Sequence, residues 1–221
     1  MTTSFQPGFN GSAGSITPDN LLAGDAKALT KSVVIDTGSL TRGALLGKIT
    51  HGAATAAAKS GGNTGNGTMG TITLGSGVLP GVYSLRVTKA VTNAGDFQLK
   101  DPNGIVVGIG SVATAFAGGG MSFTLADGST DFAVGDGFDI TVAAGSGKYV
   151  LSLAAATDGS EVPVAVLAED ADATSADVTT VAYLTGEFNS TAMTFGTGHT
   201  AASVEAGLRD LGIHLKTNQA F

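Results

Sequence analysis

Residues 149–168 read Tyr-Val-Leu-Ser-Leu-Ala-Ala-Ala-Thr-Asp-Gly-Ser-Glu-Val-Pro-Val-Ala-Val-Leu-Ala, which is two apolar runs separated by a turn. Asp158-Gly159 lies between the runs, and this pair is typical of a hairpin because glycine adopts positive φ at no steric cost. We therefore expect strands over 149–155 and 162–168. An acidic loop, Glu169–Asp177, separates them from a third expected strand over 178–188. The stretch predicts an antiparallel β-meander.

The composition favours a β-rich globular chain. Glycine accounts for 34 of the 221 residues, 43% of residues are hydrophobic and 13% are charged. Disorder requires low hydrophobicity and high charge, so we expect many short strands joined by tight turns. The formal net charge is −7 and no basic cluster stands out, which argues against direct binding of nucleic acid. The chain has no cysteine, which excludes disulfides, thiolate metal sites and cysteine nucleophiles.

No apolar run approaches the roughly 20 residues of a membrane-spanning helix, so we expect no membrane partner. The first residues, Met1–Phe5, lack the basic and apolar regions of a signal peptide. We therefore expect the chain to be made in the cytoplasm and to be used intact there, or assembled there.

Residues 1–30 show no sustained periodicity. Their apolar and proline residues stand among Gly, Ser and Asn: Phe5, Pro7, Phe9, Ile16 and Pro18. One interpretation is a frayed terminus. The other is an arm that orders on a partner, because extended peptides can add a strand to an exposed sheet edge and two phenylalanines would serve as anchors.

The next segment predicts two strands, followed by a change in amino-acid composition. Val33–Asp36 and Leu40–Ile49 are expected strands, joined by a turn at Thr37-Gly38-Ser39. Residues 53–59 are rich in alanine, and we interpret them as the end of this lobe, with one helical turn as the alternative. The glycine-rich residues 61–67 are typical of a linker.

Residues 68–144 contain four runs in which apolar and polar residues alternate. The apolar positions are Tyr83, Leu85 and Val87; Phe97 and Leu99; Met121, Phe123 and Leu125; and Phe138, Ile140 and Val142. Alternation with turns about every 8–12 residues, such as Asp101–Gly104, predicts an antiparallel sandwich or barrel. We expect residues 68–144 to form a compact β module.

A single helix is expected near the C-terminus. Thr200 is a suitable N-cap and Gly212 a suitable stop. Three apolar residues fall on one helical face and one charged pair on the other: Val204, Leu208 and Leu211, and Glu205 with Arg209. A closing strand over 213–215 follows.

Two segments match ligand-binding motifs in part, but the surrounding sequence does not fit either motif. Gly65-Asn-Gly-Thr-Met-Gly70 matches the dinucleotide-binding glycine pattern, but the expected element after it is a strand, so we interpret it as a flexible hinge. Asp170, Asp172 and Thr174 resemble the start of a calcium loop, yet the glycine and the bidentate glutamate of such a loop are missing. We interpret this segment as a solvated hairpin loop.

The three histidines, His51, His199 and His214, lie in no ligand spacing, and we expect each to be a surface or hydrogen-bonded histidine. No serine-nucleophile elbow motif is present either. We therefore predict no catalytic residue, no cofactor site and no metal site.

Several short sequence segments resemble those of the phage head decoration proteins, the lambda-type capsid-stabilising family. These are the turn Asp158–Ser160, the strand Val162–Leu167, the loop and strand start Ala171–Thr180, and Gly186-Glu187-Phe188. Two further segments resemble the family's early hairpin and its C-terminal helix followed by a strand. They are Leu46-Gly-Lys-Ile49 and Leu208-Arg-Asp-Leu-Gly-Ile213, respectively. The resemblance covers roughly residues 1–60 and 145–221 and is a resemblance of pattern.

The resemblance implies a mainly β fold with one short C-terminal helix, in which a small, discontinuous decoration-protein core carries an inserted antiparallel β-sandwich. The implied division is an arm over 1–30, a core over 31–60 and 145–221, and the inserted domain over 61–144. The implied function is structural. A homotrimer would sit at three-fold positions on the outside of the expanded head, with the arm on the major capsid protein, and would stabilise the shell against DNA pressure.

Two other functions remain open from the sequence. One is a surface or secreted β-sandwich module for adhesion or glycan binding, which predicts an export signal and often calcium ligands. The other is an enzyme of the β class, which predicts convergent polar residues in a pocket. We rank both below the decoration protein.

Overall fold

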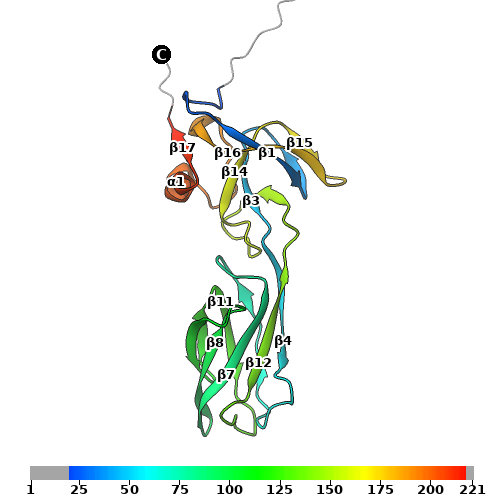
Figure 1. Ribbon diagram of the computed structural model, residues 1–221, viewed down its shortest axis with the longest axis vertical. Helices are drawn as coiled ribbons and strands as arrows, with labels where there is room; N and C mark the ends of the chain where they lie inside the picture. The colour runs from blue at the N-terminus through cyan, green and yellow to red at the C-terminus, as the bar shows by residue number, and fades with distance from the viewer. Residues whose placement is uncertain (1–19, 218–221) are drawn as a thin grey trace, which may run out of the picture.

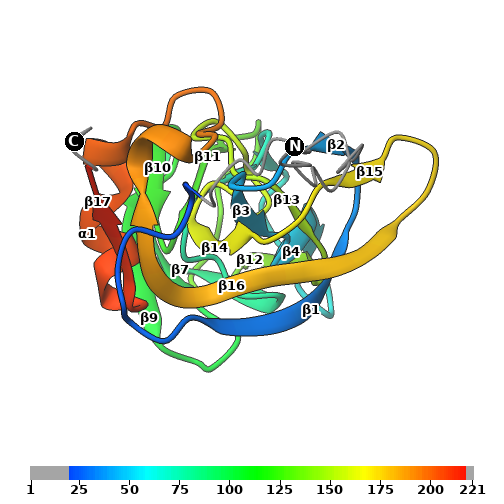
Figure 2. The same ribbon diagram turned by 90° about the horizontal axis from the view of Figure 1, so that it is seen from above.

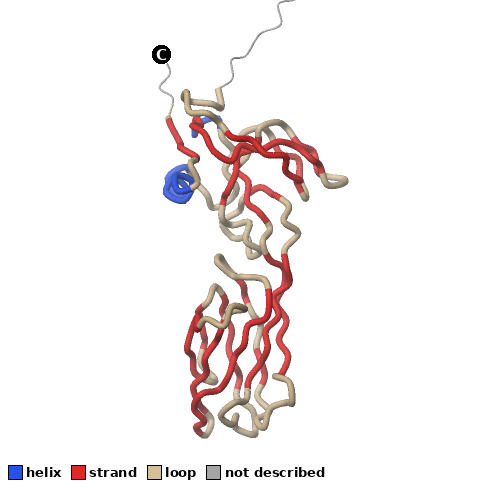
Figure 3. The backbone as a smooth tube through the Cα atoms, in the orientation of Figure 1, coloured by secondary structure: helices blue, strands red, loops and turns tan. Residues whose placement is uncertain are grey.

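The computed structural model describes residues 20–217, which are mainly β with one α-helix near the C-terminal end. This confirms the predicted fold class. The chain forms two lobes stacked along the long axis of the molecule (Figures 1 and 3). We call residues 20–50 and 145–217 the upper lobe, and residues 51–144 the distal lobe.

The upper lobe is built on a six-stranded sheet in the order β1-β13-β3-β14-β16-β17. Its elements are β1 (Leu29–Ile35), β2 (Gly38–Leu40), β3 (Leu45–Lys48), β13 (Tyr149–Leu151), β14 (Pro163–Leu167), β15 (Ala171–Ala173), β16 (Val178–Asn189), the 3-10 helix η1 (Ser190–Ala192), α1 (Ala201–Asp210) and β17 (Ile213–Lys216). Strand β1 pairs with β13 and also, over its whole length, with β16, so the sheet closes on itself. Figure 2 shows β1 and β16 side by side along one long curve.

Both faces of the sheet are buried at β3, because one packs inward and the other lies under the helix. Leu46 of β3 packs inward with Ile35 and Leu167. Its neighbour Leu45 packs outward with Leu208 of α1 and Phe188. Successive side chains of a strand point to opposite faces, which explains why the run through 44–46 is apolar without alternation.

Helix α1 forms as the sequence predicts. Thr200 is the N-cap, its side chain accepts a hydrogen bond from the backbone N–H of Ser203, and Ser203 Oγ accepts one from Thr200 N. Gly212 follows the helix with a positive φ of 77°. Val204 and Leu208 are buried, but Leu211 is 44% exposed at the C-cap, so it does not belong to the predicted buried face.

The predicted meander over 149–188 is wrong in its strand order. β13 and β14 do not pair with each other, because β3 lies between them and pairs antiparallel with both. β13 ends at Leu151, and the chain then crosses the end of β3, where Asp158 O accepts hydrogen bonds from Thr50 N and His51 N. The Asp-Gly turn is therefore part of a crossing loop and not of a tight hairpin. β14 and β16 do pair antiparallel.

The expected strand over 40–49 is divided in two. β2 leaves the sheet to pair with β15, and β3 begins at Leu45. Between them Gly43 adopts a positive φ of 88°, and a Cβ there would lie 2.7 Å from Ala192 O. The chain therefore needs glycine to turn at this point.

The distal lobe is a sandwich of two sheets around one core. Its strands are β4 (His51–Ala58), β5 (Thr68–Met69), β6 (Thr73–Leu74), β7 (Gly81–Val91), β8 (Ala94–Lys100), β9 (Val106–Ser111), β10 (Ala115–Gly118), β11 (Met121–Ala126) and β12 (Gly137–Ala144). One sheet has the order β4-β12-β7-β8-β9, and β10, β11, β5 and β6 form the other. All eleven apolar residues predicted from the alternation are buried in this core.

The alanine-rich residues 53–58 lie within strand β4 and do not form a helical turn. They pair with β12 in a register that sets Ala54, Ala56 and Ala58 opposite Val142, Ile140 and Phe138. Pairing with an apolar strand overrides the weak helical preference of alanine. The five-stranded sheet thus begins at His51, ten residues before the boundary expected at residue 61.

The two crossings between the lobes lie side by side. His51 faces Ala144 in the β4–β12 register, and Gly145 N donates to Thr50 O at 3.1 Å. His51 is fully buried there, and its Nε2 has no hydrogen-bond partner within residues 20–217. Its other ring nitrogen, Nδ1, lies 3.4 Å from Gly52 O, so His51 is a buried histidine with one of its two ring nitrogens hydrogen-bonded. His214 is exposed, as expected.

Candidate functional site

The residues predicted to contact a capsid, Phe5, Pro7, Phe9, Ile16 and Pro18, lie outside the described residues 20–217. The structure shows where the chain enters the fold after them. Leu21 is 1% exposed and packs with Phe188 and Leu45. Its carbonyl accepts from Asn189 N at 2.8 Å, and Asn189 Nδ2 donates to Asn20 O at 3.1 Å. Residues 20 and 21 are therefore part of the packed upper lobe, although they lie inside the range 1–30 assigned to the arm.

The other end of the described chain lies against the same strand. β17 pairs parallel with β16, and Gly186 faces Ile213. Lys216 Nζ contacts Glu187 Oε1 at 2.7 Å, and this hydrogen bond lowers the pKa of Glu187 below its usual value. We call this region, Asn20–Ala23 with Glu187–Asn189 and Lys216, the terminal face. In Figure 1 it lies at the end of the molecule opposite the distal lobe.

A cavity of about 710 Å³ opens between the two lobes. The distal lobe supplies the loop Gly77–Pro80, and the upper lobe supplies Leu29, Val162 and Leu211. These three upper-lobe residues are 52%, 46% and 44% exposed, and Leu79 of the loop is 43% exposed. No sequence signal indicated this cavity, because its walls come from segments far apart in the chain.

The acidic loop is tied to the sheet by a lysine. Lys148 Nζ contacts Asp177 Oδ2 at 2.7 Å and Asp36 Oδ1 at 2.8 Å, and these hydrogen bonds raise the pKa of Lys148. Asp172 Oδ1 accepts from Thr174 Oγ1 at 2.7 Å, which lowers the pKa of Asp172. The carboxylates therefore bind groups of the chain itself. Within residues 20–217, no group of three or more His, Asp or Glu residues could hold a metal ion.

The structure brings one serine and one histidine into contact, and the sequence analysis did not predict this contact. Ser152 Oγ lies 3.2 Å from His199 Nε2, and Ser152 is fully buried. Its hydroxyl donates to Ser160 O at 2.8 Å. The hydroxyl proton is thus committed to a carbonyl, so the histidine donates to Oγ and does not activate it. The pair is structural and joins the crossing loop to residue 199.

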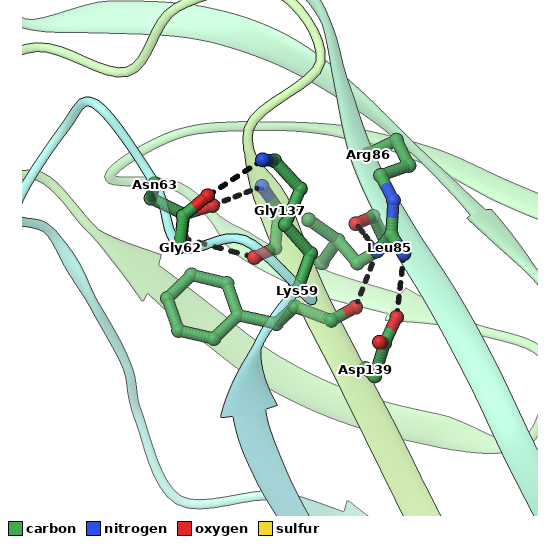
Figure 4. Close-up of polar contacts among 8 residues, drawn as sticks. Lys59, Gly62, Asn63, Leu85, Arg86, Gly137 and Asp139 are labelled. Carbon is green, nitrogen blue, oxygen red and sulfur yellow. Dashed lines mark hydrogen bonds and ion pairs between the residues drawn. The ribbon is translucent and has the colours of Figure 1, made fainter.

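The glycine-rich segment 63–67 is fixed in place and is not a hinge. Thr64 N and Gly65 N donate to the carboxylate of Asp136 at 2.9–3.0 Å, and Ala133 N does so at 2.9 Å. Figure 4 shows the adjacent pair, in which Asn63 donates to Gly137 O and accepts from Gly137 N. The backbone N–H groups of the loop therefore bind an anion that belongs to the chain.

Burial by itself raises the pKa of Asp136, but the hydrogen bonds from Gly65, Thr64 and Ala133 outweigh it and hold this pKa below its usual value.

None of the helices within residues 20–217 has the length and apolar character needed to span a membrane.

A family model described as bacteriophage lambda head decoration protein D matches residues 12–215. No curated protein matches the chain. Two crystal structures of FlgL from Xanthomonas campestris, in space groups H3 and C2, are each 20% identical over 47% of this chain, with a TM-score of 0.33. The chain spans about a third of their length, 33% and 32%. A TM-score this low does not establish a shared fold.

Proposed function

Since the chain belongs to the bacteriophage lambda head decoration protein D family and is a phage capsid decoration protein, we propose that it binds the outer surface of the expanded head as a homotrimer at three-fold positions. Residues 1–19 bind the major capsid protein, and the bound trimer stabilises the shell against the pressure of the packaged DNA. The family match over 12–215 carries this proposal.

The arrangement of the lobes supports one orientation on the shell. Residues 1–19 join the fold at Asn20, on the terminal face, and the distal lobe lies at the opposite end of the molecule (Figure 1). A chain held to the shell through residues 1–19 would therefore turn its terminal face toward the capsid. The distal lobe would then project outward.

Binding only the assembled lattice is sufficient to stabilise it. A ligand with affinity for the assembled state, and none for the disassembled one, shifts the equilibrium toward assembly by mass action. Three arms on one trimer also raise the effective concentration at each contact, so weak individual contacts give high avidity. The function therefore requires no catalytic site.

Removal of residues 1–19 tests the role of the arm. We expect the truncated protein to keep its unfolding temperature, because it retains Leu21 and the core residues packed against it, and to lose co-sedimentation with expanded capsids. A full-length variant with Phe5→Ala and Phe9→Ala should lose most of the binding, whereas the matched control Thr2→Ala with Thr3→Ala should retain it. Capsid binding by the truncated protein would refute the role of the arm.

The oligomeric state is tested separately. Light scattering should give the mass of a trimer in solution, or of a monomer that is converted to trimers on capsids, as seen in images of decorated particles. Density away from the three-fold positions would contradict the proposed site.

A further inference from the structure

The distal lobe leaves one strand edge open. β4 is the terminal strand of the five-stranded sheet and, among the described strands, pairs only with β12. It forms the right-hand edge of the distal lobe in Figure 1. Alternate residues of an edge strand present their N–H and C=O groups outward, without a partner strand. His51 is buried and its N–H already donates to Asp158 O, so the open part of this edge is residues 53–58, which span about 20 Å.

The core is also incompletely covered along this edge. Ala56 and Ala58 face inward, as judged from their pairing with the buried Ile140 and Phe138, but both are exposed. Two cavities of about 380 and 420 Å³ lie beside β4, and both are lined by Ala54 and Ile72. Another strand alongside β4 would cover this gap in the sandwich.

The opposite edge of the same sheet is not open in this way. β9 is followed directly by β10 of the second sheet, and the ring of Phe116 in β10 fills the space against Gly108 and Gly110. The gap is therefore a specific feature of the β4 side.

Residues 51–58, His-Gly-Ala-Ala-Thr-Ala-Ala-Ala, contain no Lys, Arg, Asp, Glu or Pro. Natural edge strands commonly carry such residues because these prevent pairing with another chain. Alanine side chains also leave room for a second strand at the ordinary spacing of about 4.8 Å. The edge is thus small, neutral and self-complementary.

We propose that β4 pairs antiparallel with β4 of a second copy, through a two-fold contact between distal lobes. Each chain carries a net charge of −7, so two copies repel except where they meet through neutral surfaces. A two-fold contact uses the same patch on both copies, which a self-complementary edge provides. If the proposed function holds, the contact joins neighbouring decoration proteins on the shell, where their local concentration is high.

The absence of native cysteine allows a direct test by oxidative cross-linking. Single-cysteine variants Ala54→Cys, Ala56→Cys and Ala58→Cys are oxidised in concentrated solution, with exposed Ala90→Cys at the distal tip as the matched control. A disulfide requires Cα atoms about 4.4–6.8 Å apart, so a fixed antiparallel register should give a yield of linked dimer that peaks at one β4 position. That peak should exceed the Ala90→Cys yield several-fold.

A charge on the edge should abolish this peak. Adding Thr55→Lys to the best-linking variant should reduce the linked dimer to the Ala90→Cys level without changing the unfolding temperature, because Thr55 is exposed. Equal yields at all four positions, or a yield that survives the lysine, would overturn the proposal. Cross-linking to the capsid protein with none between copies would also overturn it. The experiment in solution needs no capsid, so its failure is distinguishable from failure of the proposed function.

Discussion

Asp136 shows how one residue can organise two loops. It is 4% exposed and accepts backbone hydrogen bonds from residues 64, 65 and 133. The loop it holds is so close-packed that a Cβ at Gly65 would lie 2.7 Å from Phe132 Cα. The glycines of this segment therefore serve close approach to residues 131–136, although their spacing matches a nucleotide-binding pattern.

Asp136→Ala should destabilise the protein by about 3 kcal/mol, because buried donors lose a charged acceptor. Asp136→Asn keeps one acceptor oxygen and should cost less. The matched control is Asp139→Asn, three residues further along the chain in β12, where a partly exposed ion pair with Arg86 (Figure 4) contributes about 0–1 kcal/mol. Urea unfolding measures all three. An equal cost for Asp136→Ala and Asp139→Asn would contradict the role of the buried carboxylate.

The stabilisation from Asp136 should depend on pH in the acid range. Its folded pKa lies below the unfolded value of about 3.9, so its contribution is fully present above that value and is lost as pH falls through the folded pKa. The difference in free energy of unfolding between the native protein and Asp136→Asn should therefore be constant near neutrality and shrink at low pH. A difference that grows on acidification would mean that the pKa is raised.

At the scale of elements, the sequence predicts best where one face of a strand is buried. β7, β8, β11 and β12 alternate visibly, because each packs one face on the distal core. β4 does not, because its alanines are small and the sandwich is open beside it, so neither periodicity nor propensity identified the strand. Helix α1 was predictable because its cap and stop are local features.

Strand order was less predictable than strand position. The Asp158-Gly159 pair is a local hairpin signal, but the loop is held at the end of β3 by a hydrogen bond from Thr50, which lies more than 100 residues earlier in the chain. The cavity between the lobes depends in the same way on long-range packing. The predicted arm is a sequence hypothesis that residues 20–217 do not test.

Thr200→Ala should destabilise α1 by about 1 kcal/mol, because the side chain of the N-cap satisfies an otherwise free backbone donor of the first turn. Ser203→Ala removes the exposed hydrogen bonds that Ser203 Oγ accepts from Thr200 N and donates to Thr200 O, and it leaves the cap itself in place, so it should cost less. The matched control is Thr191→Ala, in the short helix η1. Thermal unfolding measures each change. A Ser203→Ala effect larger than that of Thr200→Ala would contradict the assigned cap.

At the scale of the whole molecule, the two lobes share few covalent and packing links. The chain passes from the upper lobe to the distal lobe at Thr50–His51 and returns at Ala144–Gly145, and these crossings are hydrogen-bonded to each other. Each lobe has its own hydrophobic core. We propose that the distal lobe is an insertion, with crossings at 50/51 and 144/145 where the sequence had suggested 60/61 and 144/145.

Deletion of residues 51–144, with Thr50 joined to Gly145 through two glycines, should leave a folded upper lobe. A Cβ on Gly145 would lie 2.5 Å from the Thr50 carbonyl carbon, so the join requires little movement. We expect cooperative unfolding and retained co-sedimentation with expanded capsids, since residues 1–19 and the terminal face remain. A second variant joins Thr50 to Gly145 through six glycines. It distinguishes failure caused by a join that is too short from failure caused by loss of contacts that the upper lobe needs. If both variants are insoluble, the upper lobe depends on the distal lobe and the insertion hypothesis is wrong.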